Sequence, residues 1–175
     1  MVPDRSCPAR PGRLGWTVEA TRTSRSRGGE VAERQFCTFY VEGLCFGIGV
    51  REVQEVIRYQ EMTRVPLAAS VVRGLINLRG QIVTAIDLRR RLELPDRSDA
   101  GESLPMNLVV RTDDGVVSLL VDEIGEVVEV DEDSFERPPP TLSGVARELV
   151  RGVYKREGSL LLVLDTARAV SVSRS

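Results

Sequence analysis

The sequence contains no histidine, and this absence excludes several kinds of chemistry. Neither a Ser-His-Asp nor a Cys-His catalytic arrangement is possible, and the commonest metal ligand is missing. Three cysteines, spaced 30 and 8 residues apart, fit neither a disulfide framework nor a zinc pattern, so we expect a reducing compartment. No apolar run approaches the roughly 18 residues that a membrane span needs. These absences predict a soluble, cytoplasmic protein with no metal site and no cofactor.

Lysine is nearly absent, and the basic residues are concentrated at one end of the chain. Lys155 is the single lysine, and 24 basic residues face 26 acidic ones, for a net charge of −2. Residues 1–34 carry seven arginines and four acidic residues, a net charge of +3, which leaves −5 for the rest. An acidic main body argues against a nucleic-acid binder held by phosphate contacts.

Residues 1–34 have the composition of a tail. They are rich in Pro, Gly, Ser and Arg and contain few large apolar residues, so they cannot bury enough surface to offset the entropy of ordering. They also lack the 7–15-residue apolar core of a secretory signal. We therefore predict a disordered basic N-terminal tail. The alternative is a basic arm that contacts an acidic surface.

Four X-Gly dipeptides lie between apolar runs and predict β-hairpins. They are Glu42-Gly43, Arg79-Gly80, Asp114-Gly115 and Glu157-Gly158. Glycine supplies the positive φ that two-residue hairpin turns need.

The first hairpin has a well-specified register. A turn at Glu42-Gly43 places three apolar pairs on one face, which are Val41 with Leu44, Phe39 with Phe46, and Cys37 with Ile48. A slip of one residue would turn the small and polar side chains of the other face inward. Cys45 is not opposite Cys37 in this register, so a disulfide between them is not expected.

The chain repeats itself. Residues 72–92 read VRGLINLRGQIVTAIDLRRRL and align without a gap with residues 150–170, VRGVYKREGSLLLVLDTARAV. Upstream, EVQEVI at 52–57 aligns with EIGEVV at 123–128. Each half then reads as hairpin, third strand, linker, second hairpin and short helix. This order predicts an all-β fold of two small five-stranded barrels.

Each second hairpin ends in an aspartate, Asp87 or Asp165, before a short helical pattern. Their shared repeat position favours helix N-caps, because a carboxylate can accept the free N–H groups of a first turn. The alternative is a pair of catalytic carboxylates. Without other catalytic groups, the chain resembles a binding module more than an enzyme.

Two charged runs are interpreted as solvated surface. The acidic residues between 122 and 133 lack the oxygen order of a calcium loop and predict a solvated strand edge. Residues 89–91, three consecutive arginines, predict the wet face of the short helix, with Leu88 and Leu92 turned inward.

Several blocks together resemble the CheW family, adaptor proteins of bacterial chemotaxis and related chemosensory systems. They are FGIGVREVQEVIRY (46–59), TRVP (63–66) and VRGLINLRGQIVTAIDLRRRL (72–92), continued by VDEIGEVVEV (121–130) and GSLLLVLD (158–165). The resemblance covers about 35–170, which predicts a CheW-like domain there and a short C-terminal tail at 171–175.

The resemblance implies a fold of two five-stranded, SH3-like barrels and a scaffold function without catalysis. Family members bind the regulatory domain of a CheA-type histidine kinase and the cytoplasmic tip of chemoreceptors. A cytoplasmic protein recruited to membrane receptor arrays is therefore expected, with possible self-association, no bound nucleic acid and no direct membrane insertion.

The resemblance also assigns sites residue by residue. The receptor-binding groove would use Val53, Glu55, Val56, Arg79 and Ile124. The kinase-binding end would use Gly74, Leu78, Gly80 and Ile82. Each assignment has a structural alternative: the valines could be core, Glu55 and Arg79 a surface ion pair, and Gly80 a turn residue alone.

The chain departs from the family pattern at three places. Thr84 stands where the family commonly has proline, and Pro138, Pro139 and Pro140 and the basic N-terminus are unusual. Threonine fits a strand, so the predicted fold is unaffected. Other functions left open are an adaptor of a non-flagellar pathway such as pilus motility or development, nucleic-acid binding through the N-terminal arm, and an enzyme using Asp87 or Asp165.

Overall fold

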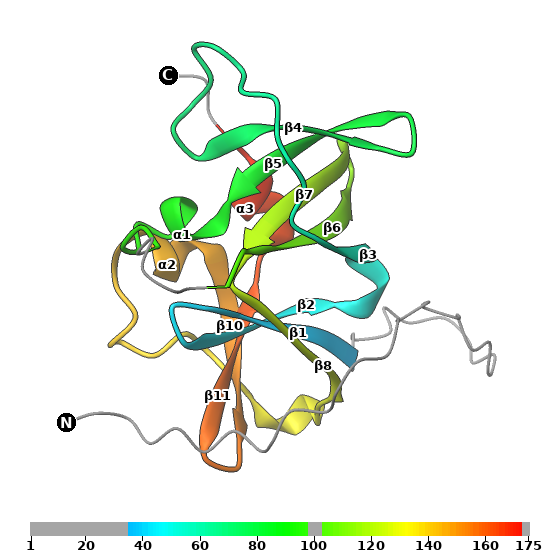
Figure 1. Ribbon diagram of the computed structural model, residues 1–175. Coiled ribbons are helices and arrows are strands. Elements are labelled where there is room, and N and C mark those ends of the chain that lie inside the picture. Colours follow the sequence, from blue (N-terminus) through cyan, green and yellow to red (C-terminus); the bar gives the residue numbers. More distant parts are fainter. Residues whose placement is uncertain (1–34, 98–102, 173–175) are drawn as a thin grey trace. The chain divides into compact units, whose positions relative to one another are not determined.

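A computed structural model describes residues 35–97 and 103–172 (Figure 1). The predicted tail at 1–34 and most of the predicted C-terminal tail lie outside these residues. The strands are β1 (Gln35–Val41), β2 (Leu44–Gly49), β3 (Val53–Arg58), β4 (Val72–Leu78), β5 (Gln81–Asp87), β6 (Met106–Thr112), β7 (Gly115–Val121), β8 (Glu123–Glu129), β9 (Phe135–Glu136), β10 (Val150–Arg156) and β11 (Ser159–Leu164). The helices are α1 (Leu88–Arg91), α2 (Gly144–Leu149) and α3 (Thr166–Val170), with 3-10 turns η1 (Val50–Glu52) and η2 (Glu132–Ser134).

The strands form two sheets, which confirms the prediction of an all-β fold. Sheet A has six strands in the order β8-β1-β2-β11-β10-β9, and sheet B has five in the order β3-β6-β7-β5-β4. The sixth strand of sheet A, β9, has only two residues and comes from the linker of the second half. The two sheets are consistent with the expected pair of small barrels.

The two sheets do not correspond to the two halves of the sequence. The first hairpin, β1–β2, pairs with β8 and β11 of the second half. Its counterpart β6–β7 pairs with β3 and β5 of the first half. The halves therefore exchange their first hairpins. The chain crosses between the sheets twice, through η1 and through the single residue Asp122.

One apolar core joins both sheets. Phe39 and Phe46 stack with ring centroids 5.8 Å apart and pack with buried side chains of sheet B such as Leu108 and Leu119. Burying each large apolar side chain contributes about 1.5–3 kcal/mol. The predicted register of the first hairpin is confirmed in all three pairs, and Cys37 and Cys45 are free thiols.

Three of the four predicted turns are correct and one is displaced. Glu42-Gly43 and Arg79-Gly80 adopt positive φ at both positions, as a type I′ hairpin turn requires, and Glu157-Gly158 also forms its turn. The third hairpin turns at residues 113–114 instead, with Gly115 paired opposite Thr112. A glycine that supplies positive φ directly after the turn residues explains why the sequence pattern was one position off.

Two repeat-equivalent glycines allow another segment to cross close above the strand. A Cβ on Gly74 would lie 2.6 Å from the carbonyl oxygen of Thr63, and one on Gly152 would lie 2.2 Å from the ring of Phe135. In both halves the crossing segment bonds to the next residue of the strand, since Thr63 bridges to Leu75 as β9 pairs with β10. The repeat thus extends to the third-dimension packing of its linkers.

Both predicted helix caps are confirmed. The carboxylate of Asp87 accepts from the backbone N–H of Arg90 at 3.3 Å, and that of Asp165 accepts from Arg168 N–H at 3.0 Å. Leu88 and Leu92 are buried beneath the short helix, as expected. Thr84 lies inside β5, in agreement with a strand role for threonine.

Candidate functional site

The structure brings Glu55 and Arg79 together. Arg79 lies in the turn between β4 and β5, and its Nη2 donates to Glu55 Oε2 of β3 at 2.9 Å. The arginine side chain is 80% exposed and the glutamate 17%, so the arginine head faces solvent while its partner is fixed at the protein surface. Such a pair adds at most about 1 kcal/mol to stability, and its accessible guanidinium can bind a partner.

The three apolar residues of the predicted groove lie on a different face. Val56 is opposite Leu108, which is buried in the main core, whereas Glu55 is opposite Val109 of a separate cluster. Opposite residues of a ladder share a face, so Val56 points away from the Glu55 side of sheet B. Val53 and Ile124 are partly buried and pack on the main core, and Val56 is 36% exposed. Of the three, Val56 is the most accessible to a partner.

The four predicted kinase-binding residues have different environments. Ile82 on β5 is 62% exposed, whereas Leu78 is 7% exposed and belongs to the core. Gly80 has a φ of 89° and donates its N–H to the side-chain oxygen of Asn77 at 2.8 Å, so the turn alone requires it. Gly74 is required by the Thr63 crossing. Ile82 is therefore the residue of this set whose side chain is available for contact.

The sequence missed a charged cluster centred on Asp122, where the chain crosses from β7 to β8. The Asp122 carboxylate accepts from Arg89 at 2.7 and 2.8 Å, from Arg97 at 2.9 Å and from the backbone N–H of Glu42 at 2.8 Å. Arg89 also lies 2.8 Å from the Glu42 carboxylate. The cluster thus ties the first hairpin turn, α1 and the second crossover together.

The cluster shifts the ionisation of its central carboxyl. Burial would by itself raise the pKa of Asp122, but hydrogen bonds from Arg89 and Glu42 and the positive charges of Arg89 and Arg97 favour the ionised form. The net result is a pKa below the ordinary value for aspartate. The charges of Asp122 and Arg89 are therefore mutually stabilised in a poorly hydrated site.

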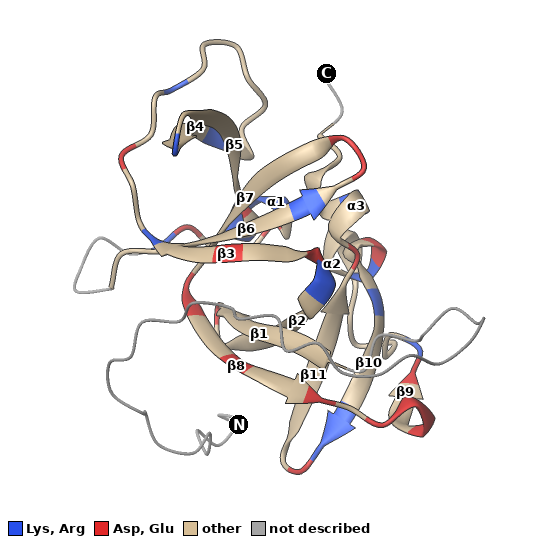
Figure 2. Ribbon diagram, turned by 90° about the vertical axis from the view of Figure 1, so that its right-hand side faces the viewer, with Lys and Arg blue, Asp and Glu red and all other residues tan. Residues whose placement is uncertain are grey.

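Two interpretations of charged runs need correction. Arg89 is buried, and Arg91 donates to the carbonyls of Arg168 and Ala169 at the end of α3, so residues 89–91 are not simply a wet face. In the acidic run, Asp122 is largely buried, while the others between 123 and 133 are exposed (Figure 2). The short helix has carboxylate and carbonyl partners distant in sequence, which a local pattern does not reveal.

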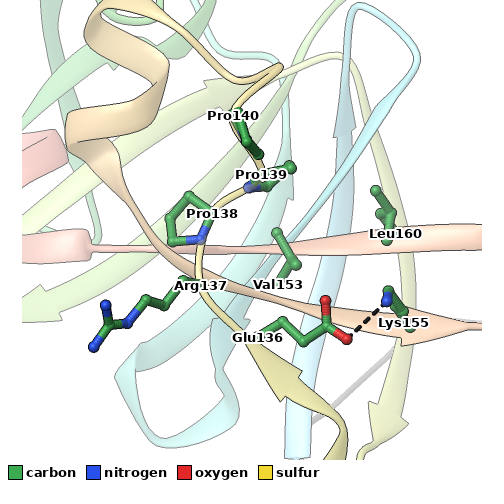
Figure 3. Close-up of a pocket in the computed structure, with 8 residues that line it drawn as sticks. All are labelled: Glu136, Arg137, Pro138, Pro139, Pro140, Val153, Lys155 and Leu160. Carbon is green, nitrogen blue, oxygen red and sulfur yellow. Dashed lines mark ion pairs between the residues drawn. The ribbon is translucent and has the colours of Figure 1, made fainter.

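The unusual proline run lines a surface hollow of about 510 Å³. Figure 3 shows Pro138, Pro139 and Pro140 passing beside Val153, with Leu160 on the other side. At its rim Lys155 Nζ lies 2.7 Å from Glu136 Oε1. Leu160 is 44% exposed and holds the repeat position of Ile82. The lining is mainly apolar, which suits contact with a partner better than chemistry.

Catalytic and metal-binding arrangements are not found in the described part of the chain. No group of three His, Cys, Asp or Glu side chains among residues 35–97 and 103–172 could hold a metal ion. None of the helices in these ranges is long and apolar enough to cross a membrane.

Comparison with known proteins identifies the family. The sequence model of the CheW-like domain matches residues 35–174. The chain belongs to the CheW family. A relative in Bacillus subtilis, "Chemotaxis protein CheW", is 33% identical over 127 residues, which are 73% of this chain and 80% of the relative. Another CheW relative, in Treponema pallidum, is 28% identical over 78% of this chain and 82% of its own length.

A solved CheW structure also matches. The scaffolding protein TtCheW from Thermoanaerobacter tengcongensis superposes with a TM-score of 0.72 at 26% identity, over 82% of this chain and 96% of that one. The predicted resemblance to the CheW family is thereby confirmed, and a scaffold function agrees with the names of these relatives. CheW proteins are scaffolds, in keeping with the prediction of a binding module.

Proposed function

We propose that this CheW-family chain is a non-catalytic adaptor that couples chemoreceptors to a CheA-type histidine kinase in chemotaxis signalling. It would work in the cytoplasm, recruited to membrane receptor arrays. The observation that carries the proposal is an accessible arginine, Arg79, fixed by Glu55 in a hairpin turn whose next strand exposes Ile82. An exposed apolar residue beside an oriented guanidinium is typical of a protein-binding surface.

The kinase contact is assigned to the β4–β5 end of sheet B, centred on Ile82. A side chain 62% exposed loses much apolar surface when a partner covers it. Gly74, Leu78 and Gly80 support this end through packing and turn geometry rather than through side-chain contact.

The receptor contact is assigned to Val56, with Val53 and Ile124 beneath it and Glu55–Arg79 on the neighbouring face. A receptor tip is an amphipathic helical hairpin, which docks through apolar residues with a polar rim. The partly exposed Val56 supplies an apolar contact, and the Arg79 head supplies a polar one.

The first test measures binding of the full chain to the purified regulatory domain of the cognate kinase. We expect micromolar affinity, lowered about tenfold by Ile82→Ser. Leu160→Ser is the matched control, because it changes an exposed aliphatic residue at the equivalent repeat position. No binding by a folded wild-type chain would overturn the adaptor function, and equal effects of the two substitutions would overturn the assignment to Ile82.

The second test concerns the receptor. Val56→Asp should weaken binding to a soluble receptor-tip fragment, with Val127→Asp as control, since Val127 is an exposed valine of β8. Thermal unfolding of both variants separates contact from core. If Val56→Asp unfolds the protein and the milder Val56→Thr leaves receptor binding unchanged, the valine belongs to the core alone.

A further inference from the structure

The loop between β3 and β4, residues 59–71, exposes an apolar side chain in a strained conformation. Leu67 is 105% exposed, relative to the reference for its residue type, and has a φ of 61°. Leucine rarely adopts this left-handed region, and such outliers cluster at functional sites. Val65 of the same loop is 38% exposed. Figure 1 shows this loop projecting at the top of the molecule, away from sheet A.

Beside Leu67 the loop borders a hollow of about 280 Å³ that is lined by arginines. Its charged lining residues are Arg64, Arg73 and Arg90, with no acidic side chain among them. Arg90 is already held by Asp96 at 3.1 Å and by the carbonyl of Ser70 at 3.3 Å. Arg64 and Arg73 have no hydrogen-bond or ion-pair partner among the described residues. The hollow therefore presents two uncompensated guanidinium groups.

The loop is held in place although it projects. Thr63 exchanges two backbone hydrogen bonds with Leu75, at 2.8 and 2.9 Å, and Val72 donates to the carbonyl of Ala69 at 2.8 Å. The contact of Gly74 beneath Thr63 closes the same base. A loop fixed at its base loses less conformational entropy when it binds, which favours affinity.

We propose that the β3–β4 loop is a second contact with the kinase, in which Leu67 enters an apolar cavity and Arg64 and Arg73 bind carboxylates around it. This inference rests on the proposed adaptor function and extends it. The kinase regulatory domain is the chosen partner because the loop is bonded to β4, so its surface continues the β4–β5 end that carries Ile82. Apolar and arginine side chains together suit a protein surface better than a lone anion.

The first experiment substitutes glycine for Leu67. Glycine adopts positive φ without strain, so Leu67→Gly removes the side chain while the fold is kept or stabilised. We expect about tenfold weaker binding to the kinase domain with an unchanged or higher melting temperature. Leu104→Gly, which changes a leucine that is 70% exposed outside this loop, should leave affinity unchanged.

The second experiment reverses the charge of the hollow with Arg64→Glu and Arg73→Glu together, against Arg147→Glu on α2 as the control. We expect about tenfold weaker kinase binding and a weaker dependence of the affinity on salt. Unchanged affinity of both loop variants for the kinase domain would overturn the inference while leaving the adaptor function intact. A loss confined to a receptor-tip fragment, or saturable binding of inorganic phosphate in the hollow, would also overturn it. Failure of the wild-type chain to bind the kinase domain would remove both proposals.

Discussion

Two arginine–carboxylate sites in this chain have similar distances and opposite surroundings. Arg79 and Glu55 meet at 2.9 Å, and Arg89 and Asp122 at 2.7 Å. The arginine is 80% exposed in the first pair and 10% in the second, where further donors surround the carboxylate. Water screens an exposed pair, whereas a buried charge that loses its partner is strongly destabilised. The same chemistry therefore serves binding at one site and folding at the other.

The largest expected effect comes from Asp122→Asn. The substitution leaves Arg89 buried and only partly compensated by Glu42, and should lower the free energy of unfolding by roughly 2–3 kcal/mol. Urea denaturation checks this value. Glu123→Gln alters the adjacent, exposed carboxylate and should change stability by less than about 0.5 kcal/mol. Equal effects of the two substitutions would contradict the contrast between the sites.

The next effect is a dependence of stability on pH. The folded pKa of Asp122 lies below its unfolded value, so its contribution is complete above the unfolded pKa of about 3.9. It is lost as the pH falls through the folded pKa. The difference in unfolding free energy between wild type and Asp122→Asn should accordingly narrow below about pH 4. A constant difference from pH 7 to pH 3 would show that the charge of Asp122 does not stabilise the fold.

Charge reversal at the exposed site should act on binding instead. Arg79→Glu repels Glu55 and removes the accessible guanidinium, so activation of the kinase in a receptor–adaptor–kinase mixture should fall by about tenfold. The free energy of unfolding should change by no more than about 1 kcal/mol. Normal activation by a folded Arg79→Glu variant would exclude this pair from the interface.

The smallest effect is the coupling within the exposed pair. A double-mutant cycle of Arg79→Ala and Glu55→Ala should give an interaction free energy of about 0–1 kcal/mol in urea denaturation. The corresponding cycle of Arg89→Ala and Asp122→Ala should give a clearly larger value. Similar coupling at both sites would mean that burial does not distinguish them.

The sequence predicted features that depend on neighbouring residues. The first hairpin register, the caps at Asp87 and Asp165 and the repeat all follow from local pattern, and all are present. The resemblance paired Glu55 with Arg79, and the structure places them in contact.

Features set by distant contacts were not predictable. Sequence similarity says that β1–β2 and β6–β7 are equivalent, but it does not say which sheet each one completes. The repeat also gives no signal for Asp122, because its counterpart in the first half is Arg51, an exposed residue of η1. Burial of Arg89 depends on a carboxylate 33 positions away, beyond the reach of helical periodicity.

The exchange of hairpins between the halves has a consequence for how the chain folds. Sheet A is complete only when β2 pairs with β11, where Phe46 lies opposite Leu162. A ribosome must therefore release nearly the whole domain before the first hairpin finds its place, and such long-range pairing slows folding. Until then the apolar face of Phe39 and Phe46 is uncovered. Neither half of the gene sequence would give a stable protein if expressed alone, although each looks like a complete repeat.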